Sequence, residues 1–98
     1  MKHFIDISNF EVKKLDSIIK KAKHIKRNHK KFSNKCKNKT LGMIFQKDST
    51  RTRASFTVGF QKLGGNTIEL NPKSIGFGKR ESVEDILRTL AQFIDVLV

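Results

Sequence analysis

The chain has 98 residues, enough for one small domain, and its composition is globular, with 37% hydrophobic residues and a formal net charge of +12. No apolar run reaches the roughly 20 residues that a membrane span requires, and the N-terminal segment lacks the apolar core of a secretory signal. The one cysteine, Cys36, excludes an internal disulfide framework. We therefore expect a cytoplasmic protein.

The positive charge lies mainly in the first forty residues. They hold thirteen Lys and Arg against three acidic residues, whereas residues 41–98 hold eight against six. Such a segment is typical of a nucleic-acid-binding protein, but also of a solvated helix face. Twelve of the thirteen basic residues are Lys, whereas base and phosphate recognition usually enlists Arg as well. A small basic nucleic-acid-binding protein is therefore only the alternative, and nucleic acid is not the expected partner.

A first helix is predicted over residues 9–29. Ser8 and Glu11 have the spacing of a capping box, in which a hydroxyl caps the helix and a Glu three residues later reaches back. Apolar residues that recur at helical spacing follow them, and such a stripe indicates core contact. These residues are Val12, Leu15, Ile18, Ile19, Ala22 and Ile25. A polar connector follows over residues 28–39.

A strand, a helix and a second strand are predicted next. Leu41–Phe45 is a short, continuous apolar run, which is typical of a strand covered on both faces in a parallel sheet. The periodicity of residues 54–63 fits either a strand or a helix. The hydroxyl residues before this segment and Gly64-Gly65 after it favour a helix. Thr67–Leu70 is the second strand.

The remaining residues predict a loop, a helix and a third strand. Residues 71–80 contain a proline and two glycines, and Ser82 and Asp85 have the spacing of a second capping box. A third strand begins at residues 94–98. The order α-β-α-β-α-β predicts an α/β fold, a partial three-layer arrangement around a parallel sheet. Because the third strand stops without a turn signal, we expect the 98 residues to be a truncated piece.

Two arginines and three hydroxyl residues follow the first predicted strand: Ser49, Thr50, Arg51, Thr52 and Arg53. Ligands of open α/β sheets bind at the carboxyl ends of strands, where the next helix begins. The unpaired N–H groups and the dipole of a helix N-terminus attract phosphate, and an Arg offers a planar fork to two of its oxygens. From the residues alone, a phosphate site and a capped helix with surface arginines both remain open.

The stretch FQKDSTRTRASF, Phe45–Phe56, resembles the carbamoyl-phosphate signature of the aspartate and ornithine carbamoyltransferases, whose hallmark is Ser-Thr-Arg-Thr-Arg. The resemblance extends to the loop GFGKRES and the helix after it. Residues 1–98 therefore look like the N-terminal part of a carbamoyl-phosphate-binding domain, without the amino-acid-binding domain. Lys47-Asp48 favours the ornithine branch, although Gln46 replaces the Glu usual there, and aspartate carbamoyltransferase is the alternative.

The resemblance implies transfer of the carbamoyl group of carbamoyl phosphate to L-ornithine, giving L-citrulline and phosphate in arginine metabolism. It implies no metal and no cofactor. Ser49, Thr50, Arg51 and Thr52 would hold the phosphate, Arg51 and Thr52 would act in catalysis, and Arg53 would brace the loop from behind. The 98 residues alone are expected to be inactive.

In the family, the sites form between the subunits of a trimer, and the loop after the second strand reaches into the neighbour's site. This loop has Gly76 at a position where many ornithine enzymes carry a ligand-binding Gln. Lys79 or Arg80 would have to replace that contact. The implied partners are carbamoyl phosphate, L-ornithine and, for the full-length protein, two further copies in a homotrimer.

Overall fold

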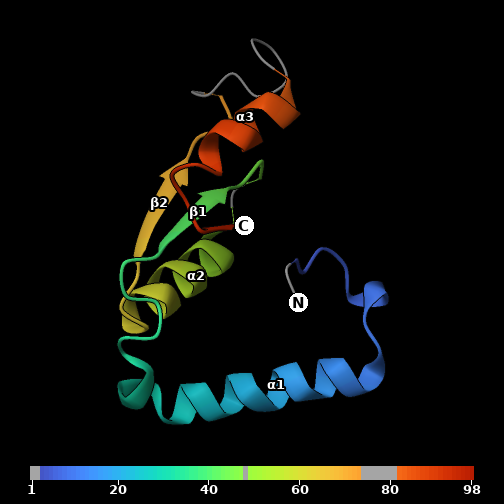
Figure 1. Ribbon diagram of the computed structural model, residues 1–98, viewed down its shortest axis with the longest axis vertical. Helices are drawn as coiled ribbons and strands as arrows, with labels where there is room; N and C mark the ends of the chain where they lie inside the picture. Colours follow the sequence, from blue (N-terminus) through green and yellow to red (C-terminus); the bar gives the residue numbers. More distant parts are fainter. Residues whose placement is uncertain (1–2, 48, 74–81) are drawn as a thin grey trace. The chain divides into compact units, whose positions relative to one another are not determined.

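The computed structural model describes residues 3–47, 49–73 and 82–98, and the chain forms two compact units, residues 1–32 and 33–98 (Figure 1). In the first unit, the α-helix α1 (Val12–Arg27) lies between two 3-10 turns, η1 (Ile7–Asn9) and η2 (His29–Phe32). Across the described ranges, every helix is too short or too polar to cross a membrane.

The start of α1 differs from the prediction. The helix begins at Val12, after Glu11, whose side chain makes no capping hydrogen bond. Asp6 caps the preceding turn instead, because its carboxylate accepts a hydrogen bond of 3.0 Å from the backbone N–H of Ser8. The predicted capping box of Ser8 and Glu11 is therefore wrong, since Asp6 already occupies the N–H group that Glu11 would have bound.

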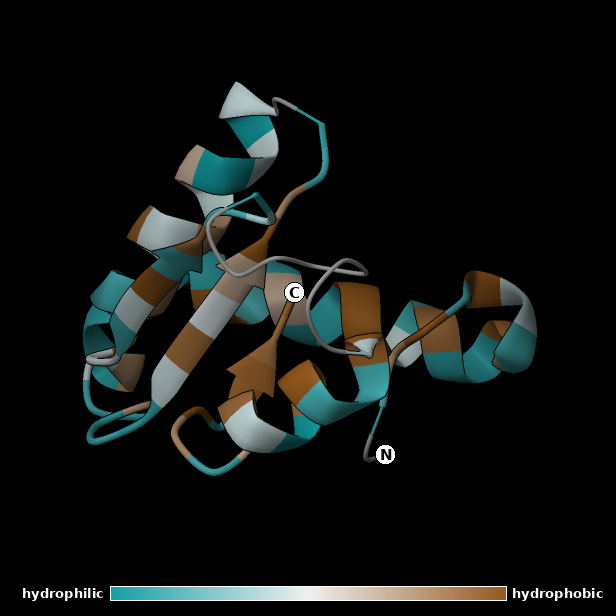
Figure 2. Cartoon of the chain, turned by 90° about the horizontal axis from the view of Figure 1, so that it is seen from above, coloured by the Kyte–Doolittle hydropathy of each residue, from teal (hydrophilic) through white to brown (hydrophobic). Residues whose placement is uncertain are grey.

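Along α1, apolar residues recur at helical spacing among lysines, so the helix is amphipathic. Figure 2 colours the whole chain by hydropathy. The apolar stripe of α1 finds little cover within the first unit, since the side chains of Val12 and Ile19 are more than half exposed. Two ring contacts of this unit lie outside the stripe: His24 and Phe32 meet edge to face at 5.7 Å, and the rings of Phe4 and Phe10 stack at 4.8 Å. Leu15, Ile18 and Ile25 are half-buried, and no residue of α1 is fully buried.

The second unit is built on a parallel sheet of three strands in the order β2-β1-β3. The strands are β1 (Thr40–Ile44), β2 (Asn66–Leu70) and β3 (Val96–Leu97). Two helices connect them, α2 (Thr50–Lys62) and α3 (Val83–Leu90). The predicted α/β fold, with its order α-β-α-β-α-β, is confirmed. β1 and β2 run side by side in Figure 1.

The central strand β1 carries most of the core of this unit. Leu41, Gly42 and Met43 are buried, as expected for a strand with a hydrogen-bonded neighbour on each side and covered faces. Gly42 allows a close approach, because a Cβ atom at this position would lie 2.7 Å from Cδ1 of Ile94. The predicted burial of this strand on both faces is confirmed.

The ends of the other elements follow the expected chemistry. Gly64 has φ +90° and ends α2 in the left-handed conformation, which confirms the predicted helix. The hydroxyl of Ser82 caps α3 by accepting a hydrogen bond of 3.1 Å from the N–H of Asp85. The third strand is shorter than predicted, although Val98 still donates a hydrogen bond to the carbonyl of Gly42.

We expect the isolated 98-residue chain to be marginally stable. Among the described residues, the buried hydrophobic side chains are only Leu41, Met43 and Ile86, while Phe93 is 73% exposed. So small a core has to offset a backbone entropy of about 1–2 kcal/mol for each ordered residue. Melts followed by circular dichroism should show helical signal with a broad transition below about 60 °C. A sharp, cooperative transition above that temperature would contradict this expectation.

Gly42→Ala should lower the melting temperature, because the new methyl group forces Ile94 to move. We expect a loss of about 1 kcal/mol, the lower end of the range for overpacked cores. Gly59→Ala is the matched control: Gly59 lies within α2, and a Cβ there meets nothing within 4 Å. The control should gain about 0.5–1 kcal/mol from helix propensity. Equal effects of the two substitutions would contradict the close packing of β1.

Candidate functional site

Polar groups gather at one edge of the sheet, where its three strands end. Because β1 pairs in parallel with both β2 and β3, the carboxyl ends of the strands meet at this edge. This is the edge at which open α/β sheets bind their ligands. The described residues that follow the strands are Phe45–Lys47 and Ser49 after β1, Asn71–Lys73 after β2 and Val98 after β3.

The helix α2 begins at the same edge. Its N-cap residue is Ser49, whose side chain makes no capping hydrogen bond. The N–H of Arg53 donates to the carbonyl of Ser49 at 3.0 Å, which is the first regular hydrogen bond of the helix. The N–H groups of Thr50, Arg51 and Thr52 precede this bond, so the helix itself supplies them with no acceptor. Together with the helix dipole, they favour an anion at this position.

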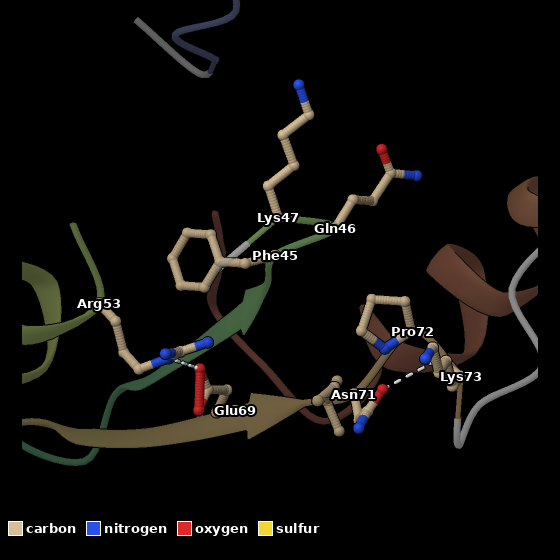
Figure 3. Close-up of a pocket in the computed structure, with 9 residues that line it drawn as sticks. Phe45, Gln46, Lys47, Arg53, Glu69, Asn71, Pro72 and Lys73 are labelled. Atoms are coloured by element: carbon tan, nitrogen blue, oxygen red, sulfur yellow. Dashed lines mark hydrogen bonds and ion pairs between the residues drawn. The ribbon is translucent and has the colours of Figure 1, made fainter. Parts of the chain in front are cut away.

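The two arginines of the first turn have different surroundings. Arg51 is exposed, whereas Arg53 is half-buried and forms an ion pair with Glu69 of β2, in which its Nε donates to Oε1. The guanidinium of Arg53 also lies 5.8 Å from the ring centre of Phe45, within reach of a cation–π interaction (Figure 3). Arg53 therefore contacts both β2 and the residue that directly follows β1.

The side chain of Arg51 leaves the helix on the side opposite to that of Arg53. Residues two apart in an α-helix are separated by about 200° around its axis. Since the side chain of Arg53 reaches β2, the side chain of Arg51 leaves the helix on the side away from that strand. Arg51 is thus available to a ligand in the free chain, while Arg53 is engaged by the protein.

Two hollows flank the end of β1. The one toward β2 is lined by Phe45–Lys47, Arg53 and Glu69–Lys73, and Figure 3 shows its side chains. The one toward β3 is lined by Ile44–Lys47, Ser49, Leu87, Leu97 and Val98. The second hollow is the more apolar, and it contains the N-cap residue of α2.

The structure brings together four of the residues predicted for the site, since Ser49, Thr50, Arg51 and Thr52 form the start of α2. The predicted loop residues Gly76, Lys79 and Arg80 lie outside the described residues. Glu69 was missed by the sequence reasoning. Its only signal in the sequence is that it is an acidic residue within the predicted second strand, and this does not identify its partner.

Comparisons with known proteins agree on one family. Residues 2–98 match the family model described as aspartate/ornithine carbamoyltransferase, carbamoyl-P binding domain. An ornithine carbamoyltransferase of Methanococcus aeolicus is 38% identical over 96 residues, which are 98% of this chain and 31% of that protein. The chain thus spans about a third of the length of the curated relatives it matches.

Solved structures from two branches of the family resemble the chain. The anabolic ornithine carbamoyltransferase of Campylobacter jejuni superposes with a TM-score of 0.87 at 33% identity, over 99% of this chain and 31% of that one. The catalytic subunit of the aspartate transcarbamoylase of M. jannaschii gives 0.85 at 30% identity, over 99% and 33%. The fold alone therefore does not separate the two branches.

Ser49→Ala should leave the stability of the chain nearly unchanged, because the Ser49 side chain makes no capping hydrogen bond. Ser82→Ala is the matched comparison, since the Ser82 hydroxyl caps α3, and it should cost about 1 kcal/mol. Denaturant titrations of both variants would measure the difference. An equal loss of stability in the two variants would show that the Ser49 hydroxyl is committed to its own helix.

Proposed function

The chain belongs to the aspartate/ornithine carbamoyltransferase family, and on this premise we propose that it forms the N-terminal part of a carbamoyltransferase and binds carbamoyl phosphate at the first turn of α2. The observation that carries this proposal is the uncapped helix start at the carboxyl edge of the sheet, with Arg51 exposed beside it. The match of residues 2–98 to a domain described as carbamoyl-P binding supports carbamoyl phosphate as the ligand.

The phosphate group would lie against the first turn of α2. Backbone N–H groups of Thr50, Arg51 and Thr52 and the three hydroxyls of Ser49, Thr50 and Thr52 supply its hydrogen bonds. Arg51 adds a charged fork that binds two oxygens. By the resemblance to the family, Thr52 would also lie beside the carbonyl oxygen of the carbamoyl group.

The reaction that we propose is an acyl transfer without a covalent enzyme intermediate. An uncharged amine attacks the carbonyl carbon, and the new carbon–nitrogen bond gives a tetrahedral oxyanion. The oxyanion then reforms the carbonyl as the bond between the carbon and the phosphate oxygen breaks, and phosphate leaves with the proton that the amine gives up. Donors fixed at a helix start stabilise the negative charge that develops on the oxyanion and on the leaving phosphate. Arg51 and Thr52 are the catalytic residues in this proposal.

We propose L-ornithine as the second substrate, giving L-citrulline in arginine metabolism. The first curated relatives are named ornithine carbamoyltransferase, at 35–38% identity over nearly the whole chain. Lys47-Asp48 before the first turn of α2 supports the same branch. Carbamoyl transfer to aspartate is the alternative, because a solved aspartate transcarbamoylase superposes nearly as well.

A cytoplasmic homotrimer completes the proposal. By the family resemblance, the loop after β2 would reach the site of a neighbouring subunit, with Lys79 or Arg80 in place of the Gln that Gly76 replaces. The amino-acid-binding part would lie in the two thirds of the relatives' length that this chain does not span.

Arg51→Ala should weaken carbamoyl phosphate binding by about 1.5–3 kcal/mol, more than tenfold, because a hydrogen bond to a charged group is lost. Calorimetric titration of the unmodified chain should give a dissociation constant in the millimolar range. Arg88→Ala is the matched control, since it removes an exposed arginine of α3 that pairs with Glu84. Unchanged affinity after Arg51→Ala would refute the proposed phosphate site, and equal losses in the two variants would indicate a general charge effect.

A second experiment separates the two branches of the family. In the longer protein of which we propose this chain to be part, carbamoyl phosphate and L-ornithine should give L-citrulline and phosphate. Aspartate in place of ornithine should give no carbamoyl aspartate. Formation of carbamoyl aspartate at a comparable rate would overturn the choice of ornithine and leave the carbamoyl phosphate site standing.

A further inference from the structure

The ion pair between Arg53 and Glu69 links the first turn of α2 to β2. We propose that Glu69 is a positioning residue: by holding Arg53, it fixes the rotation of the first turn of α2 and so the direction of Arg51 toward the phosphate. This inference rests on the proposed function. It assigns a role to a side chain that does not itself touch the ligand.

The register of the sheet puts Glu69 on the face that α2 covers. Glu69 lies opposite Met43 in the parallel pairing of β1 and β2, so both side chains leave the same face of the sheet. Met43 is 1% exposed and its Sδ lies 3.8 Å from Oγ1 of Thr57 in α2. Glu69 therefore faces α2 one residue before the end of its strand, near the start of the helix.

Arg53 is held from two directions. Its Nε donates to Glu69, and its guanidinium lies 5.8 Å from the ring centre of Phe45, which follows β1 directly. Figure 3 shows the Arg53 side chain reaching across to β2, with the Phe45 ring above it. Both contacts are made by one side chain of the first turn, so they restrict the rotation of that turn relative to the sheet.

The direction of Arg51 depends on this restriction. Arg51 and Arg53 are about 200° apart around the helix axis, so a rotation of the turn moves both side chains together. Without the charge of Glu69, Arg53 keeps its own charge, and its charge-assisted bond to β2 is reduced to a weaker, neutral hydrogen bond. The turn then loses one of the contacts that fix its rotation, and part of the binding energy of Arg51 is needed to make up for that loss.

The same ion pair contributes little to stability. The side chains of Arg53 and Glu69 are 36% and 40% exposed, and solvent screens pairs of this kind. A substitution of Glu69 therefore leaves the fold in place, and its effect is on ligand binding. A substitution of a residue that only stabilised the fold would instead lower the melting temperature and leave the ligand affinity of the folded chain unchanged.

The test uses Glu69→Gln, which removes the charge and keeps the shape. Titration of the 98-residue chain with carbamoyl phosphate, followed by amide chemical shifts, should show binding about fivefold weaker, the upper end of what such a pair contributes. The matched control is Glu84→Gln, which breaks the exposed pair of Glu84 with Arg88 in α3. The two variants should have similar melting temperatures, and the control should bind carbamoyl phosphate as the unmodified chain does.

A double-mutant cycle shows whether Glu69 acts through Arg53. In an Arg53→Ala background, Glu69→Gln should have no further effect on the dissociation constant, since the partner that it holds is gone. The same fivefold loss in both backgrounds, or unchanged affinity of Glu69→Gln in the unmodified background, would overturn the positioning role while the phosphate site stands. If the unmodified chain fails to bind carbamoyl phosphate, the proposed function fails and this inference fails with it.

Discussion

The parallel pairing of β1 with both of its neighbours is the constraint on which the second unit depends. It buries Leu41 and Met43 in the middle of the sheet and brings the carboxyl ends of three strands to one edge. The helix α2 must start at that edge, because it follows β1 within a few residues. The phosphate site that we propose is thus a consequence of strand order, and the chain needs no separate element to build it.

The two arginines of the first turn of α2, Arg51 and Arg53, have different roles in the site that we propose. A first turn with two unpaired guanidinium groups would hold two cations close together without fixing the direction of either. Here Arg53 is neutralised by Glu69 and lies against Phe45, whereas Arg51 is exposed. The protein thereby separates the arginine that holds the turn from the one that we propose to bind the ligand. Ser49 is likewise not used to hold its own helix, because its side chain makes no capping hydrogen bond. Its hydroxyl is left for the ligand that we propose.

Much of the fold could be predicted from local signals in the sequence. The continuous apolar run around Leu41–Phe45 predicted a strand covered on both faces. The hydroxyl residues before the next segment and Gly64-Gly65 after it favoured a helix over a strand, and Gly64 does end that helix in the left-handed conformation. The start of α1 was predicted wrongly, because Asp6 and Glu11 are both suited to bind the N–H of Ser8 and the sequence does not rank them. Which of these two carboxylates binds the N–H of Ser8 depends on the backbone conformation of the residues between them.

The candidate site could be predicted in part. The residues from Ser49 to Arg53 were found because they are adjacent in sequence and follow a strand. The partner of Arg53 could not be found in this way, since Glu69 is sixteen residues away and meets it only through the register of β1 and β2. Residues that act through the pairing of strands leave no periodic signal of their own.

Mapping of carbamoyl phosphate by amide chemical shifts on the 98-residue chain is the most direct test of the phosphate site. The amides of Thr50, Arg51 and Thr52 should shift together and saturate with one dissociation constant. The first turn of α3, where Ser82 already caps the helix, should stay unchanged and serves as the internal reference. Shifts confined to the lysine-rich helix α1, or no saturable shift at the start of α2, would contradict the site.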